Sequence, residues 1–187
     1  SADTDGIYKC LPRTSLVGEQ KIEIKLRELV ASETYGDYLT TLSRSHSIPV
    51  MDHEVDNFLN QMPQDSVILD IGGCWGWHWR RVRQNRPDVS VVIVDFVHSN
   101  LLHAKNVLTD LIDDQVVLMH SDATSLPFKM DNNFSGFDGV WTVQTFQHIP
   151  DYRQAVLEAH RVLKVKGIFV NYSIKTQPHI YWAYRMF

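Results

Sequence analysis

Five short apolar runs that alternate with longer helical patterns restrict what this chain can fold into. The runs follow Pro63, are rich in Val, Ile and Phe, and are apolar at consecutive positions, as in strands that are covered on both faces. Strand, helix and strand at this spacing require crossover connections, which give a parallel sheet. We therefore expect an α/β fold with a doubly wound, mostly parallel sheet, whose strands are residues 66–71, 90–95, 115–120, 137–142 and 167–172.

Helical patterns occupy the gaps between these runs and the region before Pro63. Between the strands we expect helices over residues 76–86, 99–112 and 151–163. Before Pro63 two apolar helix faces occur, and Asp52 is the expected N-cap of the second. The faces are Ile22, Leu26, Leu29 and Val30, then Val55, Phe58, Leu59 and Met62. A short helix with turns is expected between them, over residues 32–45. The chain is thus expected to have a helical arm or lid over residues 1–62 and an α/β domain over residues 63–187.

Composition narrows the class of protein. Hydrophobic residues make up 44% and charged residues 21%, which allows a buried core and argues against a disordered or fibrous chain. The net charge is −4, and no basic stripe is interleaved with aromatic residues, so nucleic acid is not an expected partner. One group of arginines is expected on a solvated helix face, with a phosphate or carboxylate contact as the alternative: Arg80, Arg81, Arg83 and Arg86.

Cysteine and histidine usage argues against a metal or disulfide framework. Cys10 and Cys74 are the two cysteines and do not form a CxxC pair, which fits a reducing cytoplasm. The nine histidines show no ligand spacing, so we predict no metal site. No apolar run approaches the roughly 18 to 20 residues that cross a bilayer, and residues 1–6 are polar and acidic, unlike a signal peptide. The sequence predicts a cytoplasmic protein without a membrane span.

The first strand runs directly into a glycine turn that contains Gly72, Gly73 and Gly76. Glycine has no Cβ, so the backbone can turn tightly and a ligand can lie against it. A helix that begins after the turn would present unpaired amide hydrogens and the positive end of its dipole. Because open α/β sheets bind ligands at the carboxyl ends of their strands, a cofactor site is expected here.

An acid ends the second strand, about twenty residues after the glycine turn. Asp95 at this position can accept hydrogen bonds from both hydroxyls of a ribose, and Phe96 beside it can pack against a base. The turn and the acid together predict a cofactor that contains adenosine. The pair also serves nicotinamide and flavin enzymes and does not choose between them and methyltransferases.

The negative charge of Asp70, which ends the first strand, favours some of these cofactors over others. A carboxylate here would repel the pyrophosphate of a dinucleotide. S-adenosylmethionine has no phosphate and carries a sulfonium and an α-ammonium group, so Asp70 favours this methyl donor. After the third strand, Asp122 is placed to accept the exocyclic amine of adenine and the Ala123 amide to bind a ring nitrogen. An ordinary turn residue is the alternative role of Asp122.

Taken in order, these residues resemble the motifs of class I S-adenosylmethionine-dependent methyltransferases from about residue 66 to residue 172. The matching segments are residues 70–76, Asp95, residues 121–123 and residues 137–141. Residues 146–151, followed by residues 158–164 and Gly167, are similar to the branch that includes ubiquinone and sterol enzymes. The resemblance implies a Rossmann-like fold, S-adenosylmethionine as cofactor and methyl transfer to a small molecule. It implies cofactor contacts at Asp70, Gly72, Gly73, Asp95, Phe96, Asp122 and Ala123, with Gln144 lining the methionine side.

Two features depart from the family's pattern. Cys74 replaces the middle glycine of the turn, where its small side chain is expected to be tolerated, so that Cys74 and Gly76 complete the predicted cofactor contacts. Three tryptophans crowd the turn and are expected to pack the first helix, with a wall for the cofactor as the alternative: Trp75, Trp77 and Trp79. Family members continue after the fifth strand with a helix and an antiparallel pair of strands. Only residues 174–187 follow here, so we expect those C-terminal strands to be missing from this chain.

Methyl transfer needs little from catalytic side chains. It is an in-line displacement that depends on alignment and the exclusion of water. A base assists a hydroxyl acceptor and is scarcely needed for a neutral amine or an acidic carbon. His148, after the fourth strand, could act as the base, orient the acceptor or cap the next helix. Tyr172, at the end of the fifth strand, is a second residue that could face the acceptor.

Two other functions agree with parts of this pattern. An NAD(P)-dependent oxidoreductase of Rossmann type would use the same turn and Asp95, but it would favour glycines without Asp70. A non-catalytic module that binds S-adenosylmethionine or its product, and serves as a partner subunit, would need no base. The sequence favours a methyltransferase that acts on a small-molecule acceptor, and it specifies neither the methylated atom nor the oligomeric state.

Overall fold

The computed structural model describes residues 5–11, 47–131 and 133–172, together with separate positions between residues 18 and 29. Within this part of the chain, six strands form one sheet in which every strand pair is parallel. The strands are β1 (Tyr8–Lys9), β2 (Val67–Ile71), β3 (Ser90–Asp95), β4 (Val116–His120), β5 (Phe137–Val143) and β6 (Leu163–Tyr172). Their order in the sheet is β1-β4-β3-β2-β5-β6.

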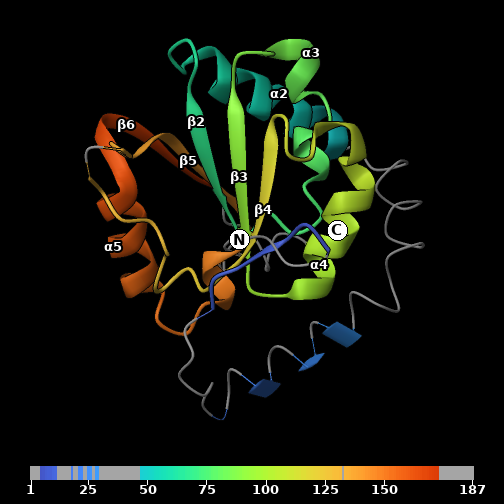
Figure 1. The fold of residues 1–187 in the computed structure, drawn as a ribbon, viewed down its shortest axis with the longest axis vertical. Coiled ribbons are helices and arrows are strands. Elements are labelled where there is room, and N and C mark those ends of the chain that lie inside the picture. The colour runs from blue at the N-terminus through green and yellow to red at the C-terminus, as the bar shows by residue number, and fades with distance from the viewer. Residues whose placement is uncertain are drawn as a thin grey trace, which may run out of the picture.

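Helices cover both faces of this sheet (Figure 1). The α-helices are α2 (Ser47–Asn60), α3 (Val82–Asn85), α4 (His98–Val107) and α5 (Tyr152–Val162), and short 3₁₀ helices are η1 (Trp77–Trp79), η2 (Thr109–Leu111) and η3 (Phe146–His148). Helices α2, α3 and α4 lie on one side of the strands, and α5 lies on the other (Figure 1). The fold is therefore the predicted doubly wound α/β fold with a parallel sheet.

Alternation along the strands divides the core into two layers. In β2, Ile68 joins the layer that contains Phe58 of α2 and Trp141 of β5. Its neighbour Leu69 points to the opposite face and joins the layer that contains Ala155 of α5. Both side chains are fully buried, as expected for strands with apolar residues at consecutive positions.

Four strands begin and end within a residue or so of their predicted limits, whereas β6 begins earlier than expected. It starts at Leu163 instead of Gly167, immediately after α5 ends at Val162. Leu163 has the extended angles φ −82° and ψ 136°, so the chain passes from helix to strand without a loop. Gly167 therefore lies inside the strand, and the expectation that it marks the strand's start is wrong.

The single helix expected over residues 76–86 is also wrong. The chain forms the three-residue helix η1 and then the separate helix α3. Gly76 at the start has φ 62°, and Arg81 between the two has φ −105° and ψ 4°, which is not helical. A long helix dipole therefore does not face the glycine turn, because the dipole depends on many aligned peptides. The helix expected over residues 99–112 is likewise divided, into α4 and η2.

Helix α2 confirms one apolar face and corrects its N-cap. The predicted residues Val55, Phe58, Leu59 and Met62 are all buried. The helix begins at Ser47, so Asp52 lies within it and is not its N-cap. The carboxylate of Asp52 instead pairs with Arg80 and Arg81, at 2.6 and 3.2 Å.

The sequence patterns did not predict β1, because two residues are too few to show a period. It pairs with β4, with Tyr8 opposite Met119. Residues 22, 26 and 29 are helical and their side chains are exposed. Val30, the helix expected within residues 32–45 and residues 174–187 lie outside the described residues. The division of the chain at residue 62 stays a prediction. In the described part, no helix combines the length and hydrophobicity that a membrane crossing requires.

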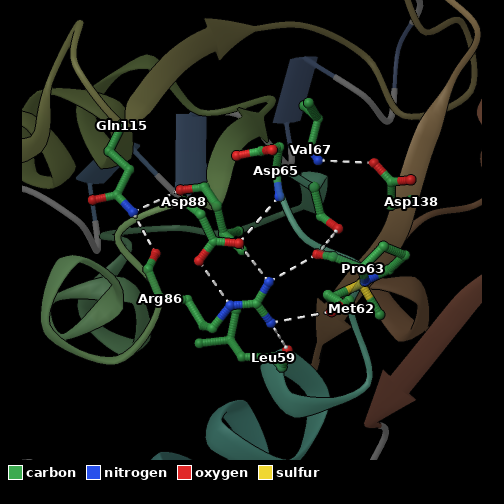
Figure 2. A network of polar contacts seen from close by, with 11 residues as sticks. Leu59, Met62, Pro63, Asp65, Val67, Arg86, Asp88, Gln115 and Asp138 are labelled. Carbon is green, nitrogen blue, oxygen red and sulfur yellow. Dashed lines mark hydrogen bonds and ion pairs between the residues drawn. The ribbon is translucent and has the colours of Figure 1, made fainter.

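A network around Arg86 fixes the amino ends of the central strands (Figure 2). Its guanidinium donates hydrogen bonds to the carbonyl oxygens of Leu59, Met62 and Pro63, at 2.6, 3.1 and 2.8 Å. It also pairs with Asp88 at 2.6 Å. The end of α2 is thereby joined to the loop before β3, at the end of the sheet opposite the predicted cofactor site.

Candidate functional site

The topology of the sheet brings the predicted site residues together at the carboxyl ends of its central strands. From β2 the chain moves outward to β3 and β4 on one side, and β5 and β6 lie on the other side. The carboxyl ends of β2 and β5 therefore enclose the point at which the strand order reverses, where open α/β sheets bind ligands. The predicted cofactor residues lie at the ends of β2 and β3 and in the loops after β2, β3, β4 and β5.

Close packing explains the first two glycines of the turn. A Cβ atom on Gly72 would lie 2.2 Å from the Thr145 side chain, which follows β5. The Thr145 hydroxyl lies 3.0 Å from the carbonyl oxygen of Val143 and 3.3 Å from that of Gly72. A Cβ atom on Gly73 would lie 2.2 Å from Oδ2 of Asp70. The turn is thus pressed against both its own strand and the loop after β5, so neither glycine has room for a side chain.

Two non-glycine residues at the site have a left-handed backbone. Cys74, in the turn after β2, has φ 52°, and Gln144, directly after β5, has φ 56°. This conformation costs about 1–2 kcal/mol for a residue with a Cβ, and such strain concentrates at functional sites. The amide of Gln144 is held by a 2.8 Å hydrogen bond to the carbonyl oxygen of Tyr172. Cys74 therefore occupies a position whose conformation favours the glycine that it replaces.

The carboxylate of Asp95 joins the loop after β2 to the start of α4. It is buried and accepts hydrogen bonds from the amides of Cys74 and Val97, at 3.0 and 2.8 Å. It also accepts from the Asn100 side chain at 3.3 Å. Phe96, next in the chain, is half-buried. Ribose hydroxyls that bind to Asp95 would share or replace these contacts.

Asp70 is fully buried beneath the glycine turn. Its Oδ2 atom accepts a hydrogen bond from Trp79 Nε1 at 2.7 Å and lies 2.9 Å from His78 Nε2. Its Oδ1 atom is buried and has no hydrogen-bond partner among the described residues. A buried carboxylate oxygen without a partner is costly. The site therefore suits a cofactor with a cationic group, such as the α-ammonium of S-adenosylmethionine, better than one with a pyrophosphate.

Asp122 and Ala123 follow β4 and are half-buried. The Asp122 carboxylate accepts hydrogen bonds from the amide and the hydroxyl of Thr124, both at 2.8 Å. This Asx turn matches the alternative role that the sequence left open for Asp122. The amide of Ser121 donates to the carbonyl oxygen of Asp95 at 3.1 Å. The turn after β4 is therefore fixed beside the end of β3.

The two catalytic candidates lie on different segments. His148 is exposed in η3, and its Nε2 atom lies 3.1 Å from the Gln147 side-chain nitrogen. Tyr172, at the end of β6, donates a hydrogen bond to Glu54 of α2, and its ring centroid lies 5.2 Å from that of Trp141. Partial burial, together with the hydrogen bond to Glu54 and the charge of Glu54, raises the pKa of Tyr172 to about 12. Tyr172 is thus suited to donate a hydrogen bond and poorly suited to act as a base.

The tryptophans after the turn serve the interior of the fold. Trp75 and Trp79 are buried. The Trp75 ring nitrogen donates to the Asn100 side chain at 3.2 Å. Trp77 is half-buried, and the Arg80 guanidinium lies 4.4 Å from its ring centroid. Carboxylates of this chain pair with all four arginines of the segment: Arg80 and Arg81 with Asp52, Arg83 with Asp114, and Arg86 with Asp88.

Sequence patterns did not predict the partners that shape the site. His78, Asn100 and Thr145 contact the predicted acids and glycines across turns or between loops. These contacts depend on tertiary structure and leave no period in the sequence. Among the residues that the structure describes, no group of three His, Cys, Asp or Glu side chains is placed to hold a metal ion.

Comparison with known families identifies the domain. Residues 69–171 match the model of a family described as a methyltransferase domain, and this match covers more than half of the chain. The chain belongs to this family. It is a class I methyltransferase domain, and its cofactor is S-adenosylmethionine.

Curated relatives agree with the family. The chain is 30% identical over 121 residues to the ubiquinone/menaquinone biosynthesis C-methyltransferase UbiE of Rickettsia prowazekii, a match that covers 62% of this chain and 47% of the relative. It is 30% identical over 112 residues to the demethylmenaquinone methyltransferase of Listeria monocytogenes, which covers 58% of this chain and 45% of the relative. The matches thus span just under half the length of these relatives.

Solved structures share the fold. The [4+2]-cyclase SpnF superposes with a TM-score of 0.57 at 22% identity, over 64% of this chain and 43% of that chain. A methyltransferase from Geobacter sulfurreducens in complex with S-adenosyl-L-homocysteine superposes with a TM-score of 0.53 at 18% identity, over 66% of this chain and 47% of that chain. Because one neighbour is named as a cyclase, the fold alone does not assign the reaction.

Proposed function

We propose that this chain holds S-adenosylmethionine at the carboxyl ends of β2, β3 and β4, as the cofactor-binding part of an enzyme that methylates a small molecule. The observation that carries the proposal is Asp70, whose Oδ1 atom is buried beside the glycine turn and has no partner among the described residues. A carboxylate there complements the ammonium group of the cofactor and opposes a pyrophosphate.

The remaining contacts follow the loops in order. Asp95 accepts the ribose hydroxyls and Phe96 packs against the adenine, which Asp122 and Ala123 bind by its polar edge. Gln144 lies beside the methionine part of the cofactor. The turn after β2 approaches the cofactor with its backbone, through Gly72, Gly73, Cys74 and Gly76. When bound, the cofactor supplies a methyl group that its sulfonium activates.

The acceptor to be tested first is a quinone precursor. Two relatives are named for ubiquinone, menaquinone or demethylmenaquinone, and one is named a C-methyltransferase. An acidic carbon needs little help from a base, which agrees with the raised pKa of Tyr172. In this proposal Tyr172 lies beside the acceptor with its hydroxyl hydrogen-bonded to Glu54, and His148 orients the acceptor or takes its proton.

In this proposal, the region predicted as an arm over residues 1–62 contributes to the acceptor side through α2, its described helix. Support comes from α2, which contacts segments on two sides of the site. Asp52 of α2 pairs with Arg80 beyond the glycine turn, at 2.6 Å, and Glu54 accepts the hydrogen bond of Tyr172 at the end of β6. A movement of α2 would thus change contacts both with the segment after the glycine turn and with Tyr172.

Calorimetric titration of the 187-residue chain tests the cofactor assignment. S-adenosylmethionine and S-adenosylhomocysteine are expected to bind, and NAD is not. Asp95→Asn should weaken both by about tenfold or more, since it removes the charge from hydrogen bonds to the ribose. Asp110→Asn removes the same charge from an exposed position in η2 and should leave binding unchanged. Binding of NAD, or of none of the three, would overturn the proposal.

A further inference from the structure

Among the described residues, hydrogen bonds hold the buried carboxylate of Asp70 at one of its two oxygens. Oδ2 accepts a hydrogen bond from Trp79 Nε1 at 2.7 Å and lies 2.9 Å from His78 Nε2. The tautomer of His78 with a proton on Nε2 donates to this oxygen, because a carboxylate accepts hydrogen bonds and cannot donate them. Oδ1 has no partner among the described residues. The polar contacts therefore fix one oxygen and leave the other, which is also buried, without a hydrogen bond from the described residues.

Aromatic packing holds His78 in place. Its side chain is 14% exposed. Its ring stacks on Trp141, with centroids 6.2 Å apart and planes at 29°, and its centroid lies 5.2 Å from that of Trp79. On the other side of Oδ2, a Cβ atom on Gly73 would approach to 2.2 Å. Donors and backbone thus enclose Oδ2, and rotation of the carboxylate would break two hydrogen bonds.

We propose that His78 is a positioning residue for cofactor selection. With Trp79 it fixes the Asp70 carboxylate so that Oδ1 faces the ammonium group of the cofactor's amino acid part. The inference rests on the proposed binding of S-adenosylmethionine and adds to it a residue that does not touch the cofactor. It assigns to His78 recognition of the amino acid part and no role in recognition of the adenosine.

Two ligands distinguish recognition of the amino acid part of the cofactor from recognition of its adenosine. S-adenosylhomocysteine contains the adenosine and the amino acid part, whereas 5′-methylthioadenosine contains the adenosine and lacks the amino acid. The ratio of their dissociation constants therefore measures recognition of the amino acid part. A loss of folded protein weakens both ligands equally and does not change the ratio, so this readout separates positioning from stability.

Calorimetry on the 187-residue chain would compare the wild type with paired variants. His78→Leu deletes one donor to Asp70 and should reduce the preference for S-adenosylhomocysteine by about tenfold, the effect of one hydrogen bond to a charged group. His78→Gln keeps an N–H group and should restore most of the preference. Trp79→Phe deletes the other donor, keeps an aromatic ring and should act like His78→Leu.

Trp75→Phe is the matched control. It removes a buried indole N–H from the same loop, but that group donates to Asn100 and not to Asp70. Its ratio should equal that of the wild type. An unchanged ratio in both His78→Leu and Trp79→Phe would overturn the role of His78 and leave the cofactor assignment intact. If the wild type binds neither ligand, the proposed function and this inference both fail.

Discussion

Replacement of Arg86 by methionine tests the account of how α2 is joined to the sheet. Methionine keeps the aliphatic part of the side chain and removes the guanidinium, which donates to the carbonyl oxygens of Leu59, Met62 and Pro63 (Figure 2). A hydrogen bond from a charged group contributes about 1.5–3 kcal/mol when its partners are desolvated. The Arg86 side chain is 19% exposed, so water can replace part of each contact. With about 1 kcal/mol for each carbonyl, Arg86→Met should lower the free energy of unfolding by about 3 kcal/mol.

Urea unfolding followed by circular dichroism measures this change through the midpoint and slope. Arg83→Met is the matched control, because Arg83 pairs with Asp114 and both side chains are exposed, at 44% and 76%. That pair should contribute less than about 1 kcal/mol. Binding of S-adenosylhomocysteine should persist in folded Arg86→Met, since the network lies at the opposite end of the sheet. Equal, small losses in the two variants would refute this account of Arg86.

Three further predictions concern the turn, a helix contact and the end of β6. Cys74→Gly should keep or raise the unfolding free energy, because glycine adopts φ 52° without strain, whereas Cys74→Val should lower it by about 1 kcal/mol or more in the same urea assay. Glu158→Gln should cost about 1 kcal/mol at pH 7. Its hydrogen bond to Arg161 lowers the pKa of Glu158, so the difference from the wild type should shrink as the pH falls below 4.5, the ordinary value; a difference that persists at lower pH would contradict this. Glu54→Gln should lower the pKa of Tyr172 from about 12 but leave it above 10.0, because the effect of burial remains when the charge of Glu54 is removed; ultraviolet titration against Tyr172→Phe measures it.

The sequence predicted the central strands because their apolar runs are continuous and separated by helical patterns. The prediction failed where an element was too short to show a period, or where tertiary contacts outweighed the local sequence pattern. Two residues of β1 show no period, and the helix expected over residues 76–86 breaks at Arg81, two residues after Trp79, whose side chain donates to Asp70. The start of β6 was missed because α5 continues into it without a turn residue.

The acids and glycines of the site could be located from sequence because they come at strand ends, which the topology gathers at one edge. What these residues contact could not be predicted. No pattern in the sequence indicates that Asp95 accepts hydrogen bonds from the amides of Cys74 and Val97, or that Asp70 accepts one from Trp79. Such contacts depend on how the loops fold back, and the roles assigned to the site residues remain predictions.

A crystal structure of the chain with S-adenosylhomocysteine tests the central claim most directly. We predict that the ligand lies across the carboxyl ends of β2, β3 and β4. Its ribose hydroxyls should lie within hydrogen-bond distance of Asp95, and its ammonium group should lie beside Oδ1 of Asp70. A ligand bound elsewhere, or one whose amino acid part points away from Asp70, would contradict the account.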